Sequence, residues 1–527
     1  MTIPWPAKEL FLAAMSPVLR EIRSESAFFD PLSLIIECEQ SSVRPKPGEQ
    51  GVEISEYADA LTQCLNELPD YESRLRFLIQ DSAWMHEVHH FYDCMCTPAG
   101  LSSFFRELSL YRDLAMSVAS LRDGDKLPEE PLFPMYQALL RRHARRDHPL
   151  PKTFNDPQEE GVRYFGELFC NMRIQRCIFN GDYGPLRVDR DLSDHHVVWL
   201  ETDLGDESFR LPTYPTVLRS GDESYPVLMP IGFRQLTENQ SIVAQRYLIA
   251  SFGRDYDHDY ALSLRQRGGT YLAVNMMCTR RATSLGVREK YHTEKLYEVV
   301  QEALSYAGAG RIGDNAGVHY AEAIEEGRIN IEGTKLVDPE LMISRYREML
   351  NDLDEWAPDC SNLGTDNVFE LVRTFVLEHI ARPALERFID DAKSDLTPTP
   401  YSLDYRALLA NGRLPEPPIS ISGEQVLFSY ALLNDENNLA DWIRAFVAWI
   451  FMRVALEEIA MSTEFHCPVH RGPYQMVLRQ LPIQIHEHCH RGVVERSCGR
   501  VSRGGSLATH CDCLWKRSMV QLGVALE

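Results

Sequence analysis

The fold prediction starts from residues 86–90, which read His86-Glu-Val-His-His90, inside a run from Leu75 to Met95. Apolar residues of this run recur at helical spacing and form one stripe, namely Trp84, Val88, Phe91 and Met95. His86, His90 and Asp93 recur on roughly the opposite face. The pattern predicts a helix that packs on one side and presents histidines and a carboxylate on the other, as the wall of an active site does.

The histidines at positions 86 and 90 have the spacing that zinc ligands need on a helix. Residues i and i+4 share one face, so both imidazoles can reach a single Zn²⁺ ion. Glu87 lies beside them and can accept a proton from metal-bound water. The sequence therefore predicts a zinc-dependent hydrolase site. An amphipathic surface helix with solvated histidines is the competing interpretation, and His89, which points sideways, is expected to take no part.

A second H-E-x-x-H sequence occurs at residues 486–490. Pro482 precedes it and Gly492 follows it, while Ile483 and Ile485 alternate with polar residues in the manner of a strand. This context opposes a long helix, so the first sequence is the preferred metal-binding helix.

The tail from residue 466 to residue 527 differs in composition from the rest of the chain. It holds eight Lys and Arg against four Asp and Glu, whereas the whole chain carries a net charge of −23. Its cysteines and histidines could supply a four-coordinate structural zinc site. The candidate ligands are Cys467, His470, Cys498, Cys511 and Cys513. The alternative is a loose tail in which they are incidental, and contact of its basic residues with nucleic acid is a further, less favoured option.

His86, Glu87 and His90 resemble the zincin metallopeptidases, in which two histidines hold zinc and the glutamate acts as general base. The resemblance is at the level of the superfamily. It implies Zn²⁺ as cofactor and a protein or peptide as substrate. The metzincin subgroup continues with glycine three residues after the second histidine and a ligand after six. Asp93 and Cys96 occupy those positions here, so the chain departs from that subgroup and is closer to the gluzincin-like enzymes.

Three carboxylates are candidates for the third zinc ligand. Glu238 ranks first, because a glutamate followed three residues later by a small residue, here Ser241, resembles the ligand helix of several gluzincins. Glu107 ranks second, because an antiparallel helical hairpin turning near Pro98 would bring it level with His90. Asp93 ranks third, and it could instead orient His90 from behind.

The composition fits a globular protein outside the membrane. Of the 527 residues, 44% are hydrophobic and 25% are charged, which is ordinary for a soluble chain. The charge of −23 opposes non-specific binding to nucleic acid and to anionic membranes. Residues 1–30 lack the features of a signal peptide, and the apolar stretch 445–452 is too short to cross a bilayer. With 13 cysteines and no export signal, the chain is expected in the reducing cytoplasm.

The resulting prediction is an α+β protein, mainly α-helical, with a zincin-like helix. Residues 1–260 are expected to form the metal-binding region, including a β-rich segment at 185–230. Residues 261–465 are expected to form a helical domain, and residues 466–527 the Cys/His-rich tail. The favoured function is a zinc-dependent hydrolase, a metallopeptidase in which Glu87 is the general base. The competing function is a non-catalytic regulatory or scaffold protein with structural zinc in the tail.

Overall fold

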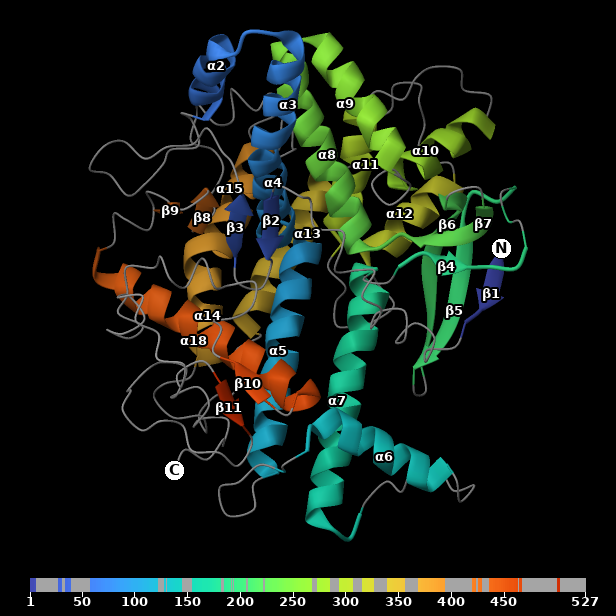
Figure 1. Ribbon diagram of the computed structural model, residues 1–527, viewed down its shortest axis with the longest axis vertical. Helices are drawn as coiled ribbons and strands as arrows, with labels where there is room; N and C mark the ends of the chain where they lie inside the picture. Colours follow the sequence, from blue (N-terminus) through green and yellow to red (C-terminus); the bar gives the residue numbers. More distant parts are fainter. Residues whose placement is uncertain are drawn as a thin grey trace.

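The computed structural model is mainly helical, with small sheets at its sides (Figure 1). The description covers residues 1–5, 27–30, 34–38, 57–121, 128, 130–144, 154–181, 184–190, 192, 194–204, 207–220, 223–267, 273–284, 293–306, 315–326, 339–355, 368–393, 419–422, 425–428, 436–462, 464–466 and 500–502. The expectation of a mainly α-helical α+β protein is confirmed at this level.

Helices make up most of the described chain. In chain order they are α2 (Tyr57–Glu67), α3 (Tyr71–Asp81), α4 (Ala83–Met95), α5 (Pro98–Ser120), α6 (Leu132–Ala144), α7 (Pro157–Asn180), α8 (Phe233–Phe252), α9 (Arg254–Arg267), α10 (Ala273–Ser284), α11 (Thr293–Leu304), α12 (Ala316–Glu325), α13 (Pro339–Glu355), α14 (Val368–Val376), the π-helical turn η4 (Leu377–Ala381), α15 (Arg382–Lys393) and α18 (Glu436–Met461). Within the described ranges, no helix has both the length and the apolar character needed to cross a membrane.

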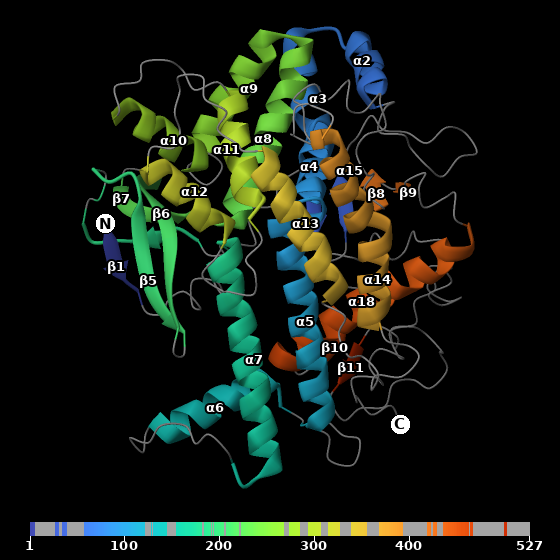
Figure 2. The ribbon, with the colours of Figure 1, turned by 180° about the vertical axis from the view of Figure 1, so that it is seen from behind.

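Helix α4 carries the His-Glu-Val-His-His sequence and lies inside the molecule (Figures 1 and 2). Every one of its residues except His90 is buried. The apolar stripe of Trp84, Val88, Phe91 and Met95 packs into the core, as its spacing predicts. The opposite face is covered as well, because α8 packs against it. The alternative of a solvated surface helix is therefore wrong.

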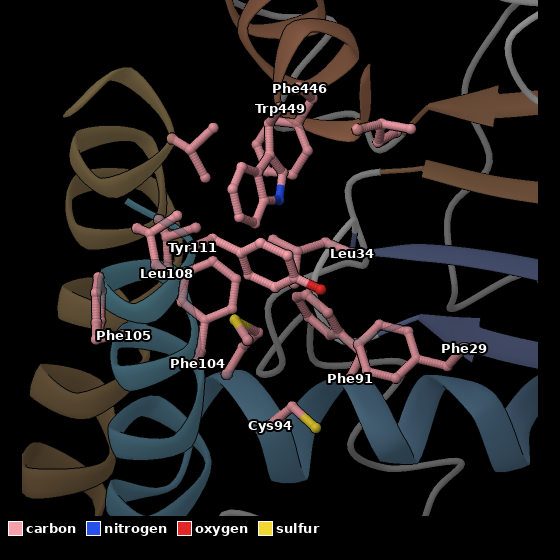
Figure 3. Packing of buried hydrophobic residues seen from close by; sticks show 14 of the residues in the cluster. Phe29, Leu34, Phe91, Cys94, Phe104, Phe105, Leu108, Tyr111, Phe446 and Trp449 are labelled. Carbon is pink, nitrogen blue, oxygen red and sulfur yellow. The ribbon is translucent and has the colours of Figure 1, made fainter. Parts of the chain in front are cut away.

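Helix α5 begins directly after α4. The N-cap side chain of Thr97 accepts a hydrogen bond from the backbone N–H of Gly100, at 3.1 Å, and Pro98 is the first helical residue. Figure 3 shows α4 and α5 meeting at a corner. The expected antiparallel hairpin is not formed, because α5 packs along α7 instead.

The largest hydrophobic cluster joins distant parts of the chain. Trp449 of α18 and Phe369 of α14 pack edge to face, and Trp449 meets Tyr111 of α5 in the same way, with ring centroids 5.5 and 5.4 Å apart. Figure 3 shows Tyr111 and Trp449 above Phe91 of α4. Residues on both sides of position 260, the expected domain boundary, therefore share one core.

Two sheets flank the helices. A four-stranded sheet has the order β2-β3-β8-β9, with strands β2 (Ala27–Asp30), β3 (Ile35–Cys38), β8 (Ile419–Ser422) and β9 (Gln425–Phe428). In it, β3 and β8 are parallel, so segments more than 370 residues apart in the sequence pair with each other, and β2 and β3 pack against α4. A five-stranded sheet has the order β1-β5-β6-β7-β4, with strands β1 (Thr2–Pro4), β4 (Leu186–Arg187), β5 (Val198–Leu204), β6 (Glu207–Ser220) and β7 (Glu223–Pro230).

The five-stranded sheet contains the predicted β-rich segment and is covered on both faces. Successive side chains of a strand point to opposite faces. In β5, Trp199 accordingly packs with residues of α10, α11 and α12, whereas Val198 and Leu200 pack against the last turns of α7. A short antiparallel pair joins β10 (Glu464–His466), at the start of the tail region, to β11 (Arg500–Ser502) within that region.

Candidate metal centre

Helices α4 and α8 pack against each other and bring three predicted ligands together. His86 and His90 come from α4, and Glu238 comes from the second turn of α8. Their ligand atoms all lie within 4.8 Å of one another. In the part of the chain that the structure describes, this is the one such group of three or more His, Cys, Asp or Glu residues. The second H-E-x-x-H sequence lies outside the described residues.

The distances within the cluster fit a zinc ion. The Nε2 atoms of His86 and His90 are 3.1 Å apart. Glu238 Oε2 lies 3.4 Å from His86 Nε2 and 3.7 Å from His90 Nε2. Zinc bonds of about 2.0–2.2 Å in a tetrahedral arrangement place neighbouring ligand atoms about 3.3–3.6 Å apart. The three side chains are thus spaced as ligands of one ion without a change of fold.

Because the cluster is buried, the charges of its side chains act strongly on one another's pKa values. The side chains of His86, His90 and Glu238 are 10%, 12% and 14% exposed. Burial alone would raise the pKa of Glu238, but the neighbouring His90 and His86 hold that pKa well below its usual value. Burial opposes the charged form of His90, yet the adjacent carboxylate of Glu238 raises the pKa of His90. A cluster that favours an ionised carboxylate beside two imidazoles is suited to a divalent cation.

Glu87 lies next to this cluster on α4 and is buried, with 5% of its surface exposed. Burial raises the pKa of Glu87 above its ordinary value, although His86 and His90 partly counter the effect. Its carboxylate also accepts a hydrogen bond from the backbone N–H of Phe29, in strand β2 beside α4. A carboxylate with a raised pKa is a stronger base than an ordinary one, so Glu87 is placed to accept a proton beside the cluster.

The structure gives Glu107 a partner other than the cluster. The guanidinium of Arg176, in α7, donates to both carboxylate oxygens of Glu107 at 2.6 Å. Such a bidentate pair satisfies the carboxylate fully. Because α5 packs along α7, Glu107 faces that helix, and the hairpin that would place it beside His90 does not exist.

Asp93 has a different neighbour from the one predicted. Its Oδ2 atom lies 3.1 Å from Nδ1 of His89, and both side chains are fully buried. Asp93 was a candidate to orient His90, but its direct contact is with His89. Residues 89 and 93 are four apart and therefore lie on the same side of α4. His89 takes part in this buried pair away from the cluster.

Polar residues that the sequence analysis did not single out fix α8 relative to α4. Gln245 of α8 donates through Nε2 to the hydroxyl of Ser82, at 2.9 Å, immediately before α4 begins. Tyr260 of α9 donates to the amide oxygen of Gln245 at 2.5 Å. Ser241, the small residue expected to allow close helix packing, is fully buried. The sequence carries no signal for this role of Gln245, because glutamine is equally suited to an exposed position on a helix.

The tail candidates Cys467, His470, Cys498, Cys511 and Cys513 lie outside the described residues. A structural zinc site in the tail, or contact of its basic residues with nucleic acid, therefore stays a prediction.

Comparison of the chain with protein-family models, with curated proteins and with solved structures found no match in any of the three. The resemblance to zincins rests on the residues of the cluster alone.

Proposed function

We propose that the protein is a zinc-dependent hydrolase with a zincin-like centre. The observation that carries the proposal is the convergence of His86, His90 and Glu238 from two helices at the separations expected for the ligands of one tetrahedral ion. Two imidazoles and one carboxylate are a donor set of catalytic zinc, which leaves the fourth position for water.

Each residue has a distinct role in this proposal. When bound, zinc would supply Lewis-acid activation and a water of lowered pKa. His86 and His90 would hold the ion through their imidazoles, and the carboxylate of Glu238 would balance its charge. Glu87 accepts the proton of the attacking water and later delivers it to the leaving group. The raised pKa of Glu87 supports this role, because a carboxylate with a higher pKa is a stronger base and accepts the proton of the attacking water more readily.

The proposed substrate is a peptide bond in a protein or peptide, as the zincin resemblance implies, and the proposed location is the cytoplasm. The competing scaffold function places the metal in the tail instead. The two proposals differ in which residues hold zinc, so metal analysis separates them.

The first test compares zinc per chain, by elemental analysis, in wild type and in His86→Ala/His90→Ala. We expect the double variant to lose about one zinc ion per chain. His258→Ala is the matched control, because His258 is an exposed histidine on α9 outside the cluster. Far-UV circular dichroism checks that the fold is retained. Equal zinc content in all three proteins would refute a metal centre on α4.

The second test separates chemistry from metal binding. Glu87→Gln keeps the size of the side chain but removes its basicity. We expect full zinc content and a loss of about 10²- to 10⁴-fold in the hydrolysis of quenched fluorogenic peptides. A variant that retains both zinc and the wild-type rate would exclude Glu87 as the general base.

A further inference from the structure

A polar recess lies where five helix ends meet, away from His86, His90 and Glu238. It measures about 300 Å³ including its open mouth. The first turns of α5, α8 and α12 contribute to it, as do the end of α7 and the residues after α11. The residues that line it include Ser102, Ser103, Arg106, Phe233, Tyr306 and Asn315. Phe233 opens α8, so Glu238 lies about 7–8 Å further along that helix.

Arg106 is the charged group of the recess. Its guanidinium carbon lies 3.4 Å from the ring centroid of Phe179, so one face of the cation is stacked on the ring. Among the described residues, no carboxylate forms an ion pair with Arg106, because the adjacent Glu107 is held by Arg176. Stacking covers the face of a guanidinium and leaves the N–H groups along its edge available to an anion. Burial lowers the pKa of Arg106 to about 10, so the group is still charged at neutral pH.

Ser102 is a second hydrogen-bond donor in the recess. Its side chain is 4% exposed and lines the recess. A serine hydroxyl in this position can donate to an oxygen of a ligand. Ser102 lies one turn before Arg106 on α5, so the two side chains are neighbours on that helix.

The helix ends around the recess are of both kinds, because α5, α8 and α12 begin there whereas α7 and α11 end there. Ala99 is in the first turn of α5, and Ala316 is the first residue of α12, directly after its N-cap Asn315. Helix N-termini carry a partial positive charge and orphan backbone N–H groups. In a chain with a net charge of −23, the guanidinium of Arg106 is the group that makes the recess a local site for negative charge.

The walls of the recess suit an aromatic or apolar group beside the anion. Phe233 contributes its ring at the start of α8. Tyr306 is held between His319, whose ring centroid is 3.5 Å away, and Arg345, whose guanidinium carbon is 3.3 Å from the Tyr306 centroid. Both faces of Tyr306 are thereby occupied, so the edge of the ring is what it can offer to a ligand.

We propose that this recess binds the oxyanion of a small molecule, a carboxylate or a phosphate attached to an aromatic or apolar group. Arg106 binds two of its oxygens along the guanidinium edge, and the Ser102 hydroxyl donates to it. The proposal does not depend on the metal centre, so it is tested on protein treated with EDTA.

The test measures binding of benzoate, phenyl phosphate and the neutral analogue benzamide by isothermal titration calorimetry. We expect benzoate or phenyl phosphate to bind about 10- to 100-fold more tightly than benzamide, because charge-assisted hydrogen bonds require the anion. The stronger of the two anions identifies the chemical group that the recess prefers. Equal binding of benzamide and both anions, or no binding of either anion, would overturn the proposal.

Variants assign the binding to the recess. Arg106→Gln should weaken anion binding about 10- to 100-fold. Arg106→Lys keeps the positive charge and should weaken anion binding less, and it serves as the test if Arg106→Gln does not fold. Arg112→Gln, on the same helix and paired with Asp113 at 3.3 Å, is the matched control and should bind as wild type does. Wild-type affinity in a folded Arg106→Gln protein would refute the assignment.

Discussion

Among single residues, Glu238 is the one on which the proposed metal centre depends most directly. Replacement by glutamine keeps the shape of the side chain but substitutes a neutral amide for the charged ligand. Loss of even an outer-shell partner costs about 10- to 100-fold in metal affinity, so we expect Glu238→Gln to weaken zinc binding by more than about 100-fold. A competition titration against a chelating dye measures the affinity. Glu107→Gln is the matched control and should bind zinc as wild type does.

We expect Glu107 to stabilise the fold and not to bind metal, since its partner is the buried Arg176. Glu107→Gln leaves the guanidinium of Arg176 without its bidentate carboxylate, although Tyr111 still lies 2.9 Å from it. Breaking a buried ion pair from one side costs about 3–5 kcal/mol, and we expect the lower end because Glu457 also interacts favourably with Arg176. Urea unfolding followed by circular dichroism measures the loss. Wild-type stability would show that the pair contributes nothing.

The two histidines of the candidate site could be predicted from the sequence. The third ligand, which lies far away in the chain, could only be chosen from a ranking of carboxylates. The helical spacing of His86 and His90 depends on neighbours in the chain, so pattern alone places them on one face. Glu238 ranked first on a short resemblance, and the geometry is compatible with that ranking. The partner of Glu107 could not be read from the sequence, because Arg176 lies on α7, 69 residues away.

At the scale of elements, the corner between α4 and α5 depends on a glycine. A Cβ atom at Gly100 would lie 2.2 Å from the carbonyl oxygen of Asp93 and 2.4 Å from that of Cys94. These are backbone atoms that cannot turn aside, so the helices would have to separate. We expect Gly100→Ala to destabilise the fold by about 1–3 kcal/mol, measured by chemical unfolding.

Gly184→Ala is the control for that substitution, because no atom lies within 4 Å of a Cβ built at Gly184. Its stability should stay within about 0.5 kcal/mol of wild type. If both alanine variants unfold alike, close approach at the corner is not what Gly100 provides.

Elements with a strong local pattern could be predicted, and those formed by distant pairing could not. The β-rich segment at 185–230 is marked by short apolar runs between turn residues, and strands β4–β7 occupy it. The four-residue strands β3 and β8 carry too little pattern to be identified alone. Ile35 pairs with Ile419, so this sheet forms only after two segments far apart in the sequence have met.

For the whole molecule, the shared core links the proposed metal centre to global stability. His86 and His90 lie on a helix buried among residues from both halves of the chain, and Glu238 lies on a helix packed against it. An unfolded chain does not preserve such a site. Zinc bound there should therefore stabilise the native state as a whole, by about 2.7 kcal/mol when free zinc is 100 times the dissociation constant.

Thermal unfolding with and without EDTA measures this increment. We expect chelation to lower the unfolding temperature of wild type and to leave that of His86→Ala/His90→Ala unchanged, because the double variant has no zinc to lose at α4. Cys511→Ser/Cys513→Ser is the informative control, since it alters the candidate tail ligands and leaves the cluster intact. If the zinc-dependent increment survives in the histidine variant and disappears in the cysteine variant, the stabilising metal is in the tail. That outcome would favour the scaffold interpretation over the hydrolase.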